Sequence, residues 1–401
     1  MQKKLMAVAV AGAMCAPAVA LAQSSTVQIY GTMYVEYAMI DQGTFAAGER
    51  EDLDILQTPG SNIGFKGEEK LGGGLSAWFQ CESTADPRGQ SKDGWCTRNS
   101  ALGLKGGFGN VFIGVWDSPF KRVASPPNVG GSDTGVFGTA GLLFGGSTTL
   151  NGNTGRANFK RRVENMINYD SPNFAGFQVM AGYQALNHAT AVTSGATDSK
   201  PRVLSLGAQY SAGPLYVSAG YEQHREFAGQ ALAGPVTPGG VSGDDTGWQV
   251  GAAYTWGPVR FGGQFTEQKF ENGAFESKVR AWHVGVDWKI VGPHGLKASY
   301  TQAGDMKGTP GAPAVPSSQS QTRPGVPAAG AANDTGANMW QIRYVYTFSK
   351  RTEFQAGYVK LSNDGGGAPG VAGGQYAIFG VGAGVPGNNQ DAFAMGVRHT
   401  F

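Results

Sequence analysis

Apolar and polar residues alternate one by one along almost the whole chain after residue 22, and this period of two constrains the fold more than any other feature. One parity is aromatic or aliphatic and the other is small or polar, as in Trp282, Val284, Val286 and Trp288 against His283, Gly285 and Asp287. Lipid on one face of a strand and water on the other impose this alternation. The pattern therefore predicts an all-β chain that forms a transmembrane β-barrel.

The alternation divides the chain into sixteen expected strands, an even number that lets the last strand pair with the first. Their bounds are 26–40, 53–68, 73–83, 97–106, 109–117, 161–171, 174–187, 201–212, 214–228, 246–257, 258–271, 278–291, 294–306, 337–349, 350–363 and 390–401. Short turns alternate with long stretches rich in Gly, Pro, Ser and Asn, an asymmetry typical of outer-membrane barrels with the short turns in the periplasm. A soluble sandwich or propeller would instead need a polar outward parity.

Composition agrees with this fold class. Gly accounts for 64 of 401 residues and aromatics for 11%, while charged residues make up 15% against about 25% in ordinary soluble domains. No linker separates two self-contained halves, so we expect residues 23–401 to form one barrel. Without the two lysines near the N-terminus, the 31 Lys and Arg residues fall to 29 and equal the 29 Asp and Glu. Net charge therefore gives no argument for a nucleic-acid partner.

The first 22 residues have the pattern of a cleaved signal peptide. Lys3 and Lys4 precede an apolar run over 5–18, and Ala20-Leu21-Ala22 offers a small-x-small cleavage site. The run is shorter than the roughly 20 apolar residues that a spanning helix needs. We expect export through the Sec pathway and a mature chain that begins at Gln23.

Two cysteines remain after the signal, at the end of one expected strand and the start of the next. In an oxidising exported compartment a disulfide between Cys81 and Cys96 is expected, and closing this loop would stabilise the fold by about 3 kcal/mol. Two free thiols at unrelated heights are the alternative. A metal site is not expected, because no His lies near this pair and the five His residues of the chain are scattered.

Four segments resemble the general porins of β-proteobacterial type: Val27–Gly31, Ile63–Glu69, Arg162–Phe177 and Gly396–Phe401. The resemblance spans residues 23–401, and its segment Arg162–Phe177 is the most specific. It implies a homotrimer of 16-stranded barrels in the Gram-negative outer membrane, in contact with lipid and lipopolysaccharide, each barrel narrowed by an inward-folded third loop. It also implies that the barrel-assembly machinery reads Phe401, and that small hydrophilic solutes pass without any cofactor.

Basic residues concentrate around the expected third loop. Between residues 98 and 162 there are eight of them against two acids, in a chain that is otherwise neutral. Arg162 shares the parity of Glu164 and Asn168, so we expect it to face the lumen, where a narrow bore focuses its field on passing anions. The residues expected at the constriction are Arg162, Lys160, Arg161, Lys66, Arg122, Asp133 and Asp117. Secondary wall charges are expected at Arg98, Lys105, Arg260, Lys297 and Arg343.

The sequence departs from the related porins at three wall positions that often hold arginine, here Asn62, Val115 and Asn168. We therefore expect a passive diffusion channel with only a mild anion preference. The alternatives are a porin that prefers phosphate or a dicarboxylate, an outer-membrane enzyme, or an adhesive barrel. An enzyme is not expected, because Ser118-x-x-Lys121 has no Lys-Thr-Gly partner and the glycine spacing at 382–387 lies in a loop, outside any βαβ unit.

Overall fold

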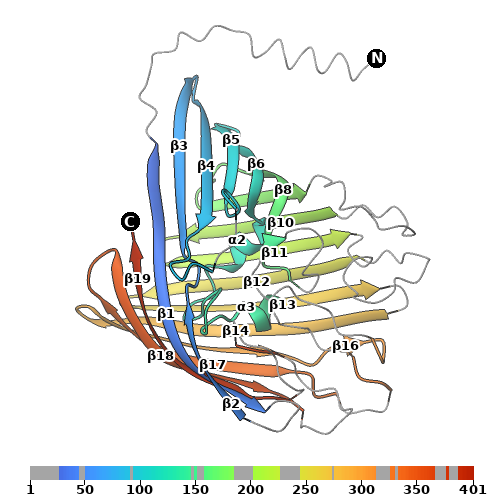
Figure 1. Ribbon diagram of the computed structural model, residues 1–401. Helices are drawn as coiled ribbons and strands as arrows, with labels where there is room; N and C mark the ends of the chain where they lie inside the picture. The colour runs from blue at the N-terminus through green and yellow to red at the C-terminus, as the bar shows by residue number, and fades with distance from the viewer. Residues whose placement is uncertain are drawn as a thin grey trace.

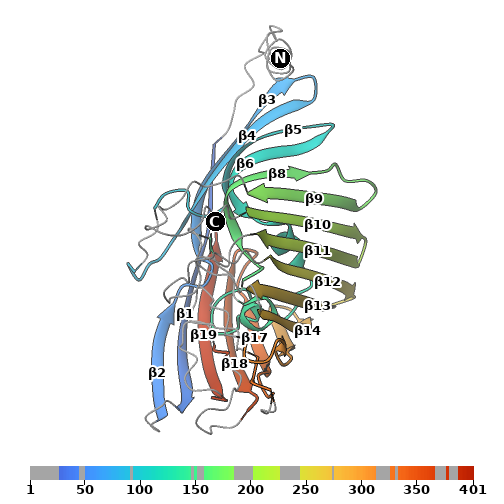
Figure 2. The same ribbon diagram turned by 90° about the vertical axis from the view of Figure 1, so that its right-hand side faces the viewer.

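A computed structural model of the chain describes residues 27–44, 50–90, 94–145, 149–150, 158–184, 202–225, 244–272, 275–312, 326–329, 333–365, 376–378 and 387–401. The expected signal peptide, Arg156 and most of the glycine motif at 382–387 lie outside these residues. Figure 1 and Figure 2 show strands that curve into a single barrel, with α2 and α3 inside the ring of strands.

Antiparallel strands close into one barrel. The long strands are β1 (Gln28–Thr44), β2 (Arg50–Gln57), β3 (Asn62–Gly72), β4 (Leu75–Thr84), β5 (Ser100–Gly106), β6 (Gly109–Asp117), β8 (Arg162–Asp170), β9 (Phe177–Gln184), β10 (Arg202–Ala212), β11 (Leu215–Arg225), β12 (Asp245–Trp256), β13 (Val259–Asn272), β14 (Phe275–Val291), β15 (His294–Ala303), β17 (Ala337–Thr347), β18 (Thr352–Asn363) and β19 (Gln390–Thr400). Two short strands, β7 (Thr149–Leu150) and β16 (Lys307–Gly308), attach to them. Because β2 and β3 both pair with β1, the seventeen long strands of the described chain occupy sixteen positions, and the predicted barrel is confirmed.

The first and last strands seal the barrel. Thr32 to Asp41 of β1 pair with Thr400 to Asp391 of β19, and Figure 1 shows the two strands side by side. Gly31 and Phe401 exchange two backbone hydrogen bonds of 3.1 Å. A Cβ atom on Gly31 would lie 2.6 Å from the ring of Phe401, so the terminal ring fills the place of a side chain there.

The outer face of the barrel is apolar, as the alternation predicts. Trp248, Trp282, Trp288 and Trp340 are each between 37% and 41% exposed, while residues between them, such as Gln249 and His283, are buried inside. No helix among the described residues is long and apolar enough to cross a membrane. The two exposed Trp residues of β14 stand at either end of its apolar face, as aromatic girdles require.

The sequence predicts one strand over 53–68, but the structure divides this segment into β2 and β3. Pro59 lacks a backbone N–H, and Gly60 has a φ of +68° that ends the extended conformation. The Ser61 hydroxyl replaces the lost ladder bonds by accepting from the backbone N–H of Tyr34 at 2.9 Å and donating to its carbonyl at 3.0 Å. The break leaves room for the tip of the third loop, since a Cβ on Gly135 would lie 2.8 Å from Pro59.

The third loop folds into the barrel and packs against the inner faces of the strands, where both form an apolar core. Helices α2 (Pro119–Ala124) and α3 (Ala140–Phe144) bury Phe120 and Phe144, whose rings meet edge to face at 5.6 Å. The loop lies so close to β14 that a Cβ on Gly285 would overlap the carbonyl oxygen of Val129. Only glycine at this position lets a loop backbone rest directly on the sheet.

A bulge in β8 breaks the parity that was used to place Arg162. Gly114 pairs with Met166 and Trp116 with Val163, so two residues oppose one, and Asn165 has a φ of +53°. Val163 is therefore buried with Met166 inside the barrel, although simple alternation predicts that it faces outward. The orientation of Arg162 follows from its contacts and not from strand period.

Candidate functional site

A charged cluster stands where β6 passes into the third loop. The Asp117 carboxylate lies 2.9 Å from the Lys121 ammonium and 3.4 Å from Nε of Arg162. Asn99 fixes the cluster from the neighbouring segment, because its amide donates to Asp117 at 3.0 Å while its oxygen accepts from Arg162 at 2.8 Å. These contacts hold Arg162 and Lys121 against the same carboxylate, with side chains 7% and 12% exposed.

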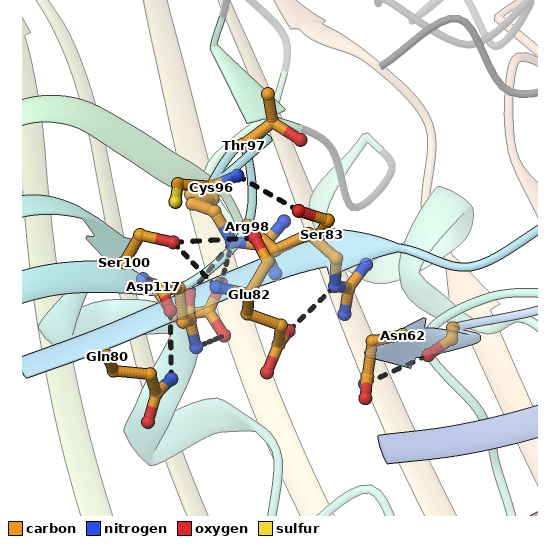
Figure 3. Close-up of polar contacts among 12 residues, drawn as sticks. Asn62, Gln80, Glu82, Ser83, Cys96, Thr97, Arg98, Ser100 and Asp117 are labelled. Carbon is orange, nitrogen blue, oxygen red and sulfur yellow. Dashed lines mark hydrogen bonds and ion pairs between the residues drawn. The ribbon is translucent and has the colours of Figure 1, made fainter. Parts of the chain in front are cut away.

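A second ion pair lines the wall beside this cluster. Arg98 Nε lies 2.7 Å from Glu82, and the Tyr30 hydroxyl donates to the other oxygen of Glu82 at 3.1 Å. Figure 3 shows the guanidinium facing this carboxylate. The Gln80 amide donates to the backbone carbonyl of Asn99 at 2.8 Å, which fixes the segment that carries Asn99 to β4.

The third pair lies on the loop itself. Asp133 is 32% exposed, and its carboxylate accepts from the ammonium of the fully buried Lys160 at 2.6 Å. Ser125 and Asn128 hold the same carboxylate at 3.5 and 3.4 Å. Lys160 therefore neutralises Asp133 from behind the loop and does not itself reach the bore.

The loop charges shift one another's pKa values. Burial raises the pKa of Asp133, but the ammonium groups of Lys160 and Lys121 lower it by more, so that it lies below its usual value. Burial lowers the pKa of Lys121, an effect that Asp117 partly offsets and Arg162 reinforces, so its net value also lies below the ordinary one. The carboxylate of Asp133 thus stays ionised to more acidic pH than an isolated one.

Three predicted pore charges have structural roles instead. Arg161 is fully buried beside Glu222, 3.5 Å from its carboxylate. Arg343 donates to the backbone carbonyls of Gly130 and Gly131 at 2.6 and 3.1 Å, and Arg260 donates to the loop carbonyl of Pro126 at 3.4 Å. Neither strand period nor charge count distinguishes a cation that anchors a loop from one that faces water, because the difference lies in its partners.

The remaining predicted charges are spread over the inner wall. Arg122 forms two bonds of 2.7 and 2.6 Å to Asp170, and Lys105 lies 2.5 Å from Glu68. Lys297 lies 3.7 Å from Asp287. Lys66 is exposed, and its ammonium lies 5.0 Å from the Tyr30 ring centroid, but among the described residues no carboxylate comes within ion-pair distance of it.

Sequence reasoning missed Glu82, Tyr30 and Asn99, which hold the cluster together. Glu82 and Tyr30 have the inward parity of their strands, opposite the outward Phe79 and Ile29, so a search for acids on that parity would have found the first. Ser118, which the sequence offered as part of an enzyme motif, caps α2 by accepting from the Lys121 backbone N–H at 3.3 Å.

A disulfide joins Cys81 and Cys96, whose Cα atoms are 4.7 Å apart. Cys81 shares the parity of the outward Phe79, so the bond lies on the outer face of β4, on the opposite side of the strand from Glu82. The Cys96 backbone N–H donates to the Ser83 hydroxyl at 2.9 Å. The disulfide ties the segment before β5 to the barrel without entering the bore.

Comparison with known proteins supports the same fold and identifies the family. The sequence model of a family described as Gram-negative porin matches residues 7–366. Outer membrane porin protein 32 of Delftia acidovorans is 28% identical over the full length of both chains, and major outer membrane protein P.IB of Neisseria gonorrhoeae is 33% identical over 46% of this chain and 48% of its own. An anion-selective porin from Comamonas acidovorans superposes with a TM-score of 0.69 at 24% identity, covering 94% of this chain and all of that one. The chain belongs to the Gram-negative porin family and is an outer-membrane β-barrel channel.

Proposed function

We propose that the channel passes small hydrophilic solutes and ions by passive diffusion, with a mild preference for anions. The charge balance at the level of the third loop supports this proposal. Four cations, Arg98, Lys121, Lys160 and Arg162, face three acids, Glu82, Asp117 and Asp133. The excess of one positive charge predicts a weak selectivity, because each acid is itself partly exposed.

The unpaired Lys66 further along the same wall adds to this excess. Arg122 and Lys105, two further inner cations, are matched by their own acids. The anion selectivity in the printed description of the Comamonas porin supports the same direction. A dedicated phosphate or dicarboxylate site would need several unpaired cations that converge, and the paired guanidinium and ammonium groups at the loop do not supply them.

The test is the zero-current potential of single channels in planar bilayers under a KCl gradient. We expect a small potential of anion-selective sign, and Arg162→Glu should move it toward cation preference with the barrel intact. At an effective dielectric of about 20, a unit charge about 4 Å away shifts an ion's energy by about 4 kcal/mol before screening. Because the Debye length is about 8 Å at physiological salt, the shift should be larger at low salt than at high salt.

Arg280→Glu is the matched control, because Arg280 is 61% exposed beside Glu267 on the outward parity of Trp282. This substitution makes the same change of two charge units away from the bore and should leave the potential unchanged. Equal potentials for the wild type and Arg162→Glu at low salt would refute the proposed role of the cluster.

We also propose that the chain assembles as a homotrimer after Sec-dependent export and removal of residues 1–22, and that Phe401 is needed for assembly. The ring of Phe401 covers Gly31 at the barrel seam, which supports a part in closure. Deletion of Phe401 should reduce the heat-modifiable trimer in outer-membrane fractions. Normal trimer levels would contradict it. A catalytic role is not part of the proposal.

A further inference from the structure

Three aromatic rings line the inner wall between β4 and β6. The centroid of Trp78 lies 5.3 Å from that of Phe112 and 5.7 Å from that of Trp116, and the latter two are 5.1 Å apart. All three have the parity opposite the outward Phe79, Val111 and Ile113. The lumen of such a barrel is ordinarily polar, so an aromatic cluster on this face needs an explanation.

The indole of Trp78 is held firmly against the wall. A Cβ on Gly103 would lie 2.5 Å from Trp78 Nε1 and 2.7 Å from Phe112 Cβ, so the glycine lets the rings lie directly on β5. The indole N–H donates to Asn110 at 2.7 Å. Phe112 is buried beneath, at 1% exposure, whereas Trp78 and Trp116 remain partly exposed. Two rings therefore offer surface to the bore in fixed positions.

A cavity of about 400 Å³ opens beside Trp78, toward the short turn between β3 and β4. Its polar lining comes from Gln28, Gln80, Lys66 and the Lys105–Glu68 ion pair. The volume falls in the range of small-molecule sites. Among the described residues that line it, Lys66 is the one cation with no acid at ion-pair distance.

This combination selects a class of ligand. A single unpaired ammonium between two amides matches one carboxylate, and an adjacent indole face favours an aromatic ring over an aliphatic chain. A dicarboxylate would leave its second charge against the already paired Lys105, and a neutral ring would leave Lys66 unused. We propose that the cavity is a binding site for aromatic monocarboxylates, an inference that rests on the proposed function as a solute channel.

The cluster also connects this cavity with the charges at the third loop. Trp116 precedes Asp117 directly, and the step from its ring to that of Trp78 is 5.7 Å. An aromatic acid that leaves the neighbourhood of Arg162 meets Trp116 first and Trp78 next. Several weak sites in sequence allow a solute to enter and also to leave, which is the condition for conduction.

The experiment measures the block of single-channel KCl current by sodium benzoate, expressed as a fraction of each channel's own open current. Acetate supplies the charge without the ring, and benzyl alcohol supplies the ring without the charge. We expect half-block by benzoate at a concentration at least tenfold lower than by either. Equal block by acetate or by benzyl alcohol would overturn the proposal.

Two substitutions locate the site, and one serves as the control. Trp78→Leu should raise the half-blocking benzoate concentration at least fivefold, and Lys66→Met should do the same independently if the first variant assembles poorly. Trp288→Leu alters an outward indole that is 40% exposed and should keep the wild-type block. Unchanged block in Trp78→Leu or in Lys66→Met would refute this site. The zero-current potential in KCl alone still tests the proposed function, so the two can fail separately.

Discussion

The two halves of the barrel wall use the same residue types for opposite purposes. Along β10 to β17 the inner face is covered by the third loop, and Arg343, Arg260 and His283 point at backbone carbonyls of that loop. Along β3 to β6 the inner face is bare, and cations such as Arg98 meet carboxylates at the edge of water. The covered wall builds a core, whereas the bare wall builds the lining of the channel.

The difference shows that the partner of a cation decides its role. A guanidinium that donates to two loop carbonyls satisfies buried backbone acceptors. Removing it leaves these carbonyls without that hydrogen-bond donor, which destabilises the loop and moves it. A guanidinium beside a carboxylate at the bore contributes little to stability but places charge near passing ions. Four perturbations, ordered by their expected effect on the current, separate these two roles.

The largest effect is expected from crowding the seat of the loop on the covered wall. Gly285→Val places side-chain atoms where the Val129 carbonyl now lies, closer than the 3.0 Å that real Cβ atoms keep, and overpacking of this kind costs about 1–3 kcal/mol. We expect the loop to shift and single-channel conductance to rise. Gly295→Ala, where the nearest atom would lie at 3.4 Å, is the control. Wild-type conductance in a folded Gly285→Val barrel would show that the loop seat does not set the bore.

The second effect concerns the anchor on the same wall. Arg343→Met removes the hydrogen bonds to Gly130 and Gly131 and the stacking of the guanidinium 4.8 Å above the Phe137 ring. Bonds to charged groups contribute about 1.5–3 kcal/mol each. Open-channel noise should rise and the thermal midpoint of the barrel should fall, while Arg280→Met on the outer surface changes neither. A quiet channel with an unchanged midpoint would contradict the anchoring role.

The third effect is on pH dependence at the bare edge of the loop. The folded pKa of Asp133 is lowered, so its charge and its contribution to stability persist above the unfolded pKa of about 3.9 and disappear as pH falls through the lower folded value. Asp133 therefore stays ionised between pH 7 and pH 5, and it should contribute little change to the wild-type zero-current potential in this range. Lys160→Met removes an ammonium group that offsets the effect of burial on Asp133, so the pKa of Asp133 rises.

The variant should consequently gain anion preference at a higher pH than the wild type as it is acidified, because protonation removes a negative charge from the bore. Lys269→Met is the control, since Lys269 is bound to Glu271 and Glu276 at the end of β13. Identical titrations of the potential for wild type and Lys160→Met would show that Lys160 does not tune Asp133.

The smallest effect on the current is expected from the disulfide, which lies on the outer face of the bare wall. Its loop spans 15 residues, for which chain-entropy arguments give about 3 kcal/mol. The double substitution Cys81→Ser and Cys96→Ser should lower the thermal midpoint and leave the zero-current potential unchanged. A changed potential would mean that the disulfide positions Glu82 or Arg98 at the bore.

The barrel was predictable from local pattern because lipid acts on every strand in the same way. The tryptophans of β14, the strand order and the closure through Phe401 all follow from a two-residue period and short turns. The candidate site followed only in part. The basic cluster around the third loop was visible in the composition of residues 98–162, but Glu82 lies on β4 and Asn99 just before β5, and only the fold brings them to the cluster.

The sequence by itself determined that this chain crosses a membrane as alternating strands, since the alternation is a direct response to lipid and water. Only the tertiary structure decided which cations face the bore. The bulge at Asn165 changes the parity of the β8 residues that precede it. The loop that packs on Gly285 places Arg343 in the core and leaves Lys121 at the edge of the bore. Both outcomes depend on contacts between residues far apart in the chain, and these contacts leave no periodic trace in the sequence.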